Sequence, residues 1–263
     1  MRVTIIGANG FVGTGLRNFL AEQPGLQLSL VTRQNYESLK GANSDITIDA
    51  SGNSKKYLSD QNPLLDLDLT VAHRLRTLQD FPASLHLHIS SVDVYHDLAS
   101  PATTREDAPI NPAASSNYGL HKSLAEQVVQ HYARSWLIVR LAGMVGPALR
   151  KNPVFDILNG LPLRIHPDSQ YQFMSTTEVA RILWKLAQTN IREQIFNVCG
   201  DGLISPRAIA ALSGKEPDLS LLPPSAAPRI VDVNIEKLKG FTSVQKTAEV
   251  MARFVKQYSP AAP

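Results

Sequence analysis

The hydrophobic positions of this chain form short aliphatic runs that alternate with stretches of helical periodicity. The short runs predict buried parallel strands at 3–6, 27–33, 45–51, 85–91, 136–141 and 194–198. Apolar positions three or four apart predict helices at 11–20, 36–40, 63–80, 118–132, 177–188, 205–213 and 244–258. In the 63–80 stretch one face carries Leu67, Val71, Leu75 and Leu78. The alternation of strands and helices predicts an α/β fold with a doubly wound parallel sheet.

The first strand runs directly into a glycine-rich turn and a helix. Gly7 permits a sharp reversal, Gly10 lets the main chain approach a pyrophosphate, and Gly13 lets the helix pack closely on the strand. Free N–H groups at the start of the helix would then bind the phosphates. Because the glycines lie between a strand and a helix, we predict a dinucleotide site here in preference to a tight turn without a ligand.

The end of the second strand indicates which dinucleotide is bound. An acidic residue there would hydrogen-bond the ribose 2′-OH of NAD, whereas an arginine can pair with the 2′-phosphate of NADP. The chain has Arg33 at this place. We therefore predict NADP, with NAD as the alternative if Arg33 is only a solvated surface side chain. The strand at 45–51 ends in the small residues Ala50 and Ser51, which leave room for a ligand over the sheet edge.

The length and composition fit one large α/β domain with a small lobe. The chain has 263 residues, of which 43% are hydrophobic and 19% charged, as in an ordinary globular enzyme. We predict a dinucleotide-binding core over 1–148 and a mostly small substrate lobe over 149–263, with elements around 177–200 returning to the core.

Charge and cysteine usage exclude several classes of partner and site. The net charge is only +3, and no basic cluster is longer than Lys55-Lys56 or Arg150-Lys151, so no nucleic-acid partner is expected. The single cysteine rules out an intramolecular disulfide and a cysteine zinc site. His86 and His88 share a strand face, but no third ligand type clusters nearby, so we expect packed or outward-facing histidines and no metal.

The N-terminus and the lengths of the apolar runs bear on where the protein resides. Residues 3–6 already form a core strand, so no signal peptide is expected. No apolar run approaches the roughly 20 residues that a membrane helix needs. We therefore expect a cytoplasmic protein without a membrane partner.

The candidate chemistry lies at the start of the 118–132 helix. Tyr118 and Lys122 are four positions apart, so their side chains share one helical face. A phenol has a pKa of about 10, and a nearby ammonium lowers that pKa and makes the phenol a usable acid or base. Ser91, at the end of a strand, can hold the substrate oxygen. A Tyr-x-x-x-Lys spacing alone is common in amphipathic helices, but the glycine turn and the serine-ended strand favour catalysis.

With these motifs, the chain resembles the extended short-chain dehydrogenase/reductases, the NAD-dependent epimerase/dehydratase family, which includes sugar-nucleotide epimerases, dehydratases and ketoreductases. The resemblance implies a Rossmann-type fold with a small C-terminal substrate lobe. It rests on GANGFVG at 7–13, HISSVDVY at 88–95, NPAASSNYGLHKSLAEQ at 111–127, VRLAGMVGP at 139–147 and FNVCG at 196–200.

The resemblance assigns roles to individual residues. It implies that Tyr118 transfers the proton, that Lys122 lowers the pKa of Tyr118 and holds the nicotinamide ribose, and that Ser91 binds the carbonyl or alcohol oxygen. The implied cofactor-binding residues are Gly7, Asn9, Gly10, Phe11, Val12, Gly13, Arg33, Ala50, Ser51, Tyr118, Lys122 and Leu141. The implied substrate-binding residues are Ser91, Asp93, Gly143 and Arg150. A homodimer through the helices around 64–80 and 115–132 is common in the family.

The sequence departs from the family pattern at several positions, and these differences bear on the reaction and on the substrate. The strand and helix that usually precede the third strand have no room here, so the adenine pocket must be built differently. Val92 and Asp93 replace the dehydratase Asp-Glu pair, which disfavours dehydration, and Gly143 replaces an Asn that usually holds a nucleotide sugar. Arg150, Lys151 and Arg164 are candidate phosphate contacts or solvated side chains.

Three functions remain open at this point. The first is an NADPH-dependent ketoreductase that acts on a nucleotide-linked 4-keto sugar or a similar carbonyl. The second is a sugar-nucleotide epimerase that retains its NAD, an alternative that Arg33 disfavours. The third is a dinucleotide-binding sensor or scaffold without turnover, which the intact Ser91, Tyr118 and Lys122 disfavour.

Overall fold

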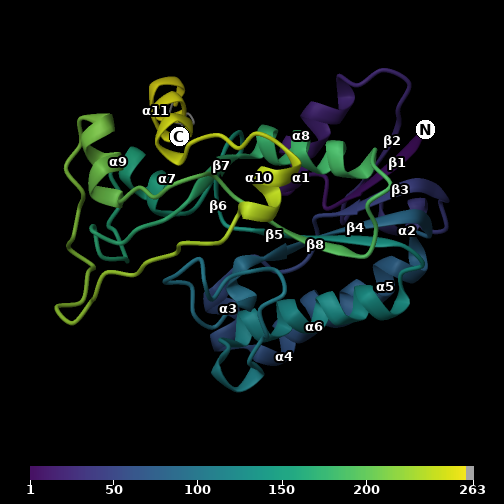
Figure 1. The fold of residues 1–263 in the computed structure, drawn as a ribbon, viewed down its shortest axis with the longest axis horizontal. Helices are drawn as coiled ribbons and strands as arrows, with labels where there is room; N and C mark the ends of the chain where they lie inside the picture. Colours follow the sequence, from purple (N-terminus) through teal and green to yellow (C-terminus); the bar gives the residue numbers. More distant parts are fainter. Residues whose placement is uncertain (259–263) are drawn as a thin grey trace.

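The computed structural model describes residues 1–258, and these are organised around one parallel sheet of six strands (Figure 1). The strand order is β2-β1-β3-β4-β5-β8. The strands are β1 (Arg2–Ile6), β2 (Gln27–Val31), β3 (Ser44–Asp49), β4 (Ala83–Ser91), β5 (Trp136–Leu141) and β8 (Gln194–Val198). Their parallel pairing brings all the carboxyl ends to one edge of the sheet, where ligands bind in folds of this kind.

Helices cover both faces of the sheet. On one face, α1 (Phe11–Ala21) packs against α8 (Thr176–Ala187). The opposite layer, below the sheet in Figure 1, consists of α3 (Lys56–Gln61), α4 (Pro63–Leu67), α5 (His73–Asp80) and α6 (Asn117–Tyr132). Only the short α2 (Tyr36–Leu39) joins β2 to β3, so residues 1–258 lack the additional strand that the family usually has here, as the sequence predicts, and β2 is the edge of the sheet.

The two faces of the sheet differ in chemistry. Toward α1 and α8 the strands present an apolar surface that includes Ile5, Ile48 and Leu87. The other face is also buried but polar, because Asp49 is fully buried on β3 and its neighbour in the strand register, His88, is fully buried on β4. The polar face therefore requires polar partners from the helices that cover it.

Because the covered sheet face is polar, the prediction of one helix with an apolar buried face over 63–80 is wrong. A π-helical turn over Asp68–Ala72 separates α4 from α5, so the stretch is not one regular α-helix. Its buried side chains are Asp66, Thr70, Arg74 and Thr77, and of these Arg74 pairs with Asp49 on the polar sheet face. The predicted apolar stripe of Leu67, Val71, Leu75 and Leu78 is only half-buried.

The C-terminal lobe has its own small core. Strands β6 (Gly143–Val145) and β7 (Phe173–Ser175) form a two-stranded parallel sheet. Around it lie α7 (Pro153–Leu158), α9 (Pro206–Ser213) and α11 (Thr247–Gln257), whose apolar side chains share one cluster. Helix α10 (Glu236–Phe241) instead packs on β8 of the main sheet.

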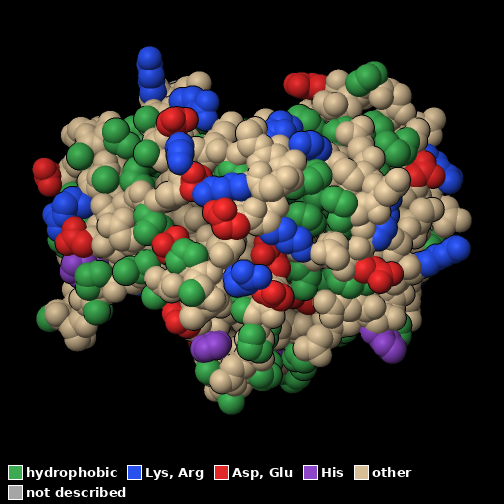
Figure 2. Space-filling model, viewed as in Figure 1, with side chains coloured by type: hydrophobic (Ala, Val, Ile, Leu, Met, Phe, Trp, Pro, Cys, Tyr) green, Lys and Arg blue, Asp and Glu red, His purple; other side chains and the backbone are tan. Residues whose placement is uncertain are grey.

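Basic and acidic side chains are interspersed on the face drawn in Figure 2, without a continuous basic stripe. Within residues 1–258, no helix is both long enough and apolar enough to cross a membrane.

Candidate active site

The glycine turn after β1 has the geometry of a nucleotide-binding loop. Gly7 has a φ of 80°, and a Cβ added to it would lie 2.9 Å from the carbonyl oxygen of Ala50. A Cβ on Gly13 would overlap the carbonyl oxygen of Gly7, so α1 can approach the turn only with glycine there. The N-cap of α1 is Gly10, which has no side chain to cap the first-turn N–H groups. These N–H groups are available to an anion.

This cradle fits a dinucleotide cofactor. The side chain of Asn9 is exposed and accepts a hydrogen bond from Arg17 at 3.2 Å. Phe11 and Val12 are half-buried at the start of α1, and each packs against a hydrophobic cluster. The glycines keep the space above the turn free of side chains, as a bound pyrophosphate requires.

The other predicted cofactor residues lie at the carboxyl edge of the sheet. Ala50 and Ser51 follow β3 directly and are half-buried beside Gly7. Arg33 follows β2 and is exposed. Leu141 ends β5, and its side chain is buried in the apolar core, so only its main chain faces this edge.

Tyr118 and Lys122 lie in the first two turns of α6, whose start is fixed by local contacts. The N–H of Gly119 donates to Oγ of the N-cap Ser116 at 3.1 Å. A Cβ on Gly119 would overlap the carbonyl oxygen of Asp93, so the helix rests directly on the chain that follows β4. Both candidate side chains are buried, and Nζ of Lys122 lies 5.4 Å from the centre of the Tyr118 ring.

Ser91 and Asp93 form a small polar centre in front of Tyr118. Oγ of Ser91 donates to Oδ2 of Asp93 at 3.0 Å and accepts from the N–H of Asp93 at 3.2 Å. Two cations from distant segments meet the same carboxylate. Nζ of Lys56 lies 2.5 Å and Nη2 of Arg229 lies 3.4 Å from Oδ1 of Asp93.

Electrostatics set the protonation of the two catalytic candidates. Burial raises the pKa of Tyr118, and the negative charges of Asp93 and Asp66 add to this, while a hydrogen bond with Ser91 acts in the opposite direction. We expected Lys122 to lower this pKa, but burial and the two carboxylates outweigh any such effect in the chain alone. The pKa of Lys122 falls to about 8, first because of burial and then because of Arg74.

A pocket opens beside Asp93. Its volume is about 420 Å³, and most of its lining comes from residues 93 and 95–99 together with Arg229 and Ile230. Ser116, the N-cap of α6, lies on its wall. The pocket therefore lies next to Asp93, the hydrogen-bond partner of Ser91, and next to the start of α6.

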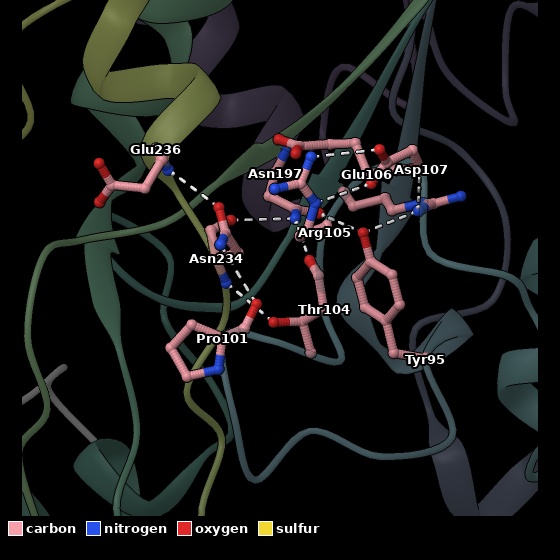
Figure 3. Close-up of polar contacts among 10 residues, drawn as sticks. Tyr95, Pro101, Thr104, Arg105, Glu106, Asp107, Asn197, Asn234 and Glu236 are labelled. Carbon is pink, nitrogen blue, oxygen red and sulfur yellow. Dashed lines mark hydrogen bonds and ion pairs between the residues drawn. The ribbon is translucent and has the colours of Figure 1, made fainter.

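Asn197 on β8 holds the two segments that line this pocket (Figure 3). Its fully buried side-chain amide donates to the carbonyl oxygens of Thr104 at 2.7 Å and Asn234 at 3.0 Å. Its Oδ1 accepts from the Tyr95 hydroxyl at 3.0 Å, and Arg140 donates to that hydroxyl at 2.8 Å. The segments 95–104 and 229–234 are thus joined through one amide.

The remaining predicted substrate residues lie farther along the chain. Gly143 is on β6, where a Cβ would lie 2.6 Å from the carbonyl oxygen of Gln172, so close packing explains its small size. Arg150 and Arg164 are exposed. Nζ of Lys151 donates to the carbonyl oxygen of Ser54, beside Lys55 and Lys56.

The sequence reasoning missed several residues of this site. Arg229, Arg74 and Asp49 gave no local signal, because each acts through a partner distant in the chain, and Asn197 lies in the FNVCG motif, which gave it no role. Lys56 was noted only as part of a short basic pair. His86 and His88 are buried in the polar layer, so the packed alternative holds and the outward-facing one does not.

Comparisons with known proteins identify solved structures that share this fold. The chain is similar in structure to a UDP-galactose 4-epimerase, with 22% identity, a TM-score of 0.78 and coverage of 97% of this chain and 98% of the other. It is similar to RMD from Pseudomonas aeruginosa, solved with NADPH, with 20% identity, a TM-score of 0.80 and coverage of 97% of each chain. A third match is dTDP-4-dehydrorhamnose reductase from Bacillus anthracis, solved with NADP, with 18% identity, a TM-score of 0.79 and coverage of 98% of each chain.

These likenesses establish the fold, and a family model establishes the family. No curated protein sequence matches the chain. The model of the NAD dependent epimerase/dehydratase family matches residues 46–199, more than half of the chain. The protein is therefore an enzyme with a dinucleotide cofactor, NAD or NADP, and it belongs to the NAD dependent epimerase/dehydratase family.

Proposed function

We propose that the enzyme is an NADPH-dependent ketoreductase that acts on a nucleotide-linked 4-keto sugar. The observation that carries this proposal is the position of Tyr118, Lys122 and Ser91 next to Asp93, a carboxylate at the edge of a pocket on which Lys56 and Arg229 converge. Two of the structurally similar proteins are a reductase of a nucleotide-linked dehydro sugar and a protein solved with NADPH. Reduction of a dehydro sugar fits the roles proposed for Ser91, Tyr118 and Lys122.

The chain's own groups would hold the carbonyl and supply the proton. The hydroxyls of Ser91 and Tyr118 would both donate to the substrate oxygen, which orients the carbonyl. As negative charge develops on that oxygen, Tyr118 would transfer its phenolic proton, which its raised pKa keeps in place beforehand. The bound nicotinamide ring supplies the hydride. Lys122, as an ammonium, would stabilise the phenolate that remains.

The charge of the substrate follows from the groups around Asp93. Lys56 and Arg229 share this one carboxylate, and Asp97 on the pocket wall offsets the second cation, so the positive charge at this edge of the site comes from the exposed Lys55 beside Lys56. Lys151 adds to it, and the pKa of Lys151 is lowered by burial and by the nearby Lys55 and Lys56. Crowded ammonium groups of this kind are stabilised by an anion. A nucleoside diphosphate would fulfil this need.

The alternative is a sugar-nucleotide epimerase that retains NAD. A structurally similar protein is a UDP-galactose 4-epimerase, and the same Ser91, Tyr118 and Lys122 can serve oxidation followed by reduction. Membership of an enzyme family argues against a sensor without turnover.

The identity of the retained nucleotide separates the two reactions. We would denature the purified protein and identify the released nucleotide by chromatography. The reductase proposal expects NADP, or an empty protein that binds NADPH more tightly than NADH. Near-stoichiometric NAD would favour the epimerase and contradict the role given to Arg33.

A further inference from the structure

A buried ion pair forms hydrogen bonds to the turn after β3. Neither of its side chains is among the proposed catalytic residues. Asp49 ends β3 and Arg74 lies on α5, and the two side chains form an ion pair with exposures of 0% and 1%. Oδ1 of Asp49 accepts from the N–H of Ser51 at 3.0 Å and from its Oγ at 2.5 Å. Nη2 of Arg74 donates to the Ser51 carbonyl oxygen at 3.1 Å. Three atoms of Ser51 are therefore fixed by one pair.

This turn lies between the glycine loop and Lys122. The N–H of Ala50 donates to the carbonyl oxygen of Ile6 at 3.0 Å, which holds the turn beside the glycine loop. At Gly52, where φ is 107°, an added Cβ would lie 3.8 Å from Nη2 of Arg74 and 3.9 Å from Nζ of Lys122. The guanidinium and the ammonium thus approach the same glycine.

Neighbouring contacts fix the far end of the turn. Nδ2 of Asn53 donates to Oδ1 of Asp66 at 2.7 Å, and Nδ1 of His121 lies 2.7 Å from Oδ2 of the same carboxylate. The segment 50–53 is thereby held by one carboxylate at each end. Such bracing limits the movement of a loop that must meet a ligand.

We propose that Asp49 and Arg74 are positioning residues that shape the 50–52 turn for the dinucleotide cofactor and set the distance between this turn and Lys122. A buried ion pair seldom stabilises a fold more than apolar side chains of similar volume would. A contribution to stability therefore does not explain why the chain has this ion pair. The three hydrogen bonds to Ser51 do explain it, because they fix the conformation of the turn.

The test compares a neutral version of the pair with a matched control. In Asp49→Asn/Arg74→Gln the amides keep some hydrogen bonds but lose the ion pair. The control is Glu178→Gln/Arg181→Gln, which neutralises an ion pair on α8 that takes no part in the site, with side-chain exposures of 8% and 37%. Affinity for NADPH and NADH is measured by fluorescence titration, and thermal melting without cofactor reports folding.

We expect the neutral pair to lose affinity for the cofactor while the protein still folds. The neutral pair should melt cooperatively and bind the preferred cofactor about tenfold more weakly, since directed hydrogen bonds to the turn are lost. The control should bind within about twofold of the parent chain. Unchanged affinity in the neutral pair, or an equal loss in the control, would overturn the proposal.

A conservative variant keeps the proposal testable if the neutral pair does not fold. Arg74→Lys retains the charge beside Asp49 but cannot also reach the Ser51 carbonyl oxygen with a rigid fork. We expect about threefold weaker cofactor binding. Affinity equal to that of the parent chain in Arg74→Lys would overturn the proposal.

The pH dependence of cofactor affinity adds a readout that a merely structural role would not move. Lys122 faces Arg74 from α5, Asp66 from α4, Asp93 after β4, His88 on β4 and Glu126 on its own helix. Cofactor affinity should fall as the pH rises and Lys122 loses its proton. Arg74→Gln removes a positive charge near Lys122 and so raises its pKa, which should move the midpoint of this fall to higher pH. Arg74→Lys keeps the charge and should leave the midpoint in place. A midpoint that does not move in Arg74→Gln would contradict the stated link to Lys122.

Discussion

Lys122 is the residue at which burial and function oppose each other most directly. Its pKa falls to about 8 from 10.5, first because of burial and then because of Arg74. Between these two pH values the unfolded chain binds more protons than the folded one, so stability rises with pH across that window. The ammonium that catalysis needs at neutral pH therefore costs folding free energy.

Replacing Lys122 with Met should stabilise the protein while removing activity. The shift corresponds to about 3 kcal/mol of unfolding free energy at pH 7, and this gain should shrink between pH 8 and 10.5. We would measure the difference in unfolding free energy between Lys122→Met and the parent chain by urea unfolding at several pH values. A difference that is constant across that range would show that the lysine is not held at a depressed pKa.

Arg33 is the residue that we expect to select the cofactor. It is exposed at the end of β2, where the chain has no carboxylate to bind the ribose hydroxyls. We propose that Arg33→Ala weakens NADPH binding about tenfold and changes NADH binding by less than about twofold. Titration with both cofactors is the measurement, and NADH serves as the internal control. Equal effects on the two would refute the role of Arg33.

At the scale of elements, α6 places Tyr118 because a glycine lets it rest on the chain after β4. Gly119→Ala would push a methyl group into the carbonyl oxygen of Asp93, and overpacking of this kind costs about 1–3 kcal/mol. Gly240→Ala is the matched control, because nothing lies within 4 Å of the added Cβ in α10. We expect Gly119→Ala to melt at lower temperature and Gly240→Ala to melt at the same or higher temperature.

The local elements were predictable where local rules decide them. The β1–turn–α1 unit follows from glycines whose added Cβ atoms would collide with neighbouring backbone, and β5 and β8 have the predicted bounds. The short α7 was missed because its start depends on Asn152, which has a φ of 136° and caps the N–H of Phe155 at 2.9 Å. Hydrophobic periodicity carries no information about such a cap.

Periodicity failed for α4 and α5 for a different physical reason. An apolar stripe predicts the buried face only if the covered surface is apolar. Here that surface contains Asp49, His86 and His88, so the helices turn Arg74 and Thr77 inward. The candidate site was predictable in its motif residues Ser91, Tyr118 and Lys122. Arg229 was not, since it reaches Asp93 from 136 positions away in the chain.

At the scale of the whole molecule, the leucines of α4 and α5 that do not enter the core could contact another subunit. Leu64 is 76% exposed and Leu65 is 40% exposed, beside the half-buried Leu67 and Leu75. Exposed leucines close together in sequence on covering helices favour an interaction site. We propose that two copies associate through α4, α5 and α6.

Sedimentation measures this association. We expect the parent chain to sediment as a dimer and Leu64→Glu as a monomer. Leu221→Glu, at a leucine that is 52% exposed in the C-terminal lobe, should remain a dimer. A monomeric parent chain would contradict the proposed interface.

The measurement that tests the central claim most directly is NADPH oxidation in the presence of a nucleotide-linked 4-keto sugar, followed by its absorbance. The account predicts turnover with this substrate, little with the free keto sugar, and at least a hundredfold loss in Tyr118→Phe with NADPH binding retained, a loss of about the size expected for a missing general acid. Turnover that persists in Tyr118→Phe, or activity indifferent to the nucleotide, would contradict the account.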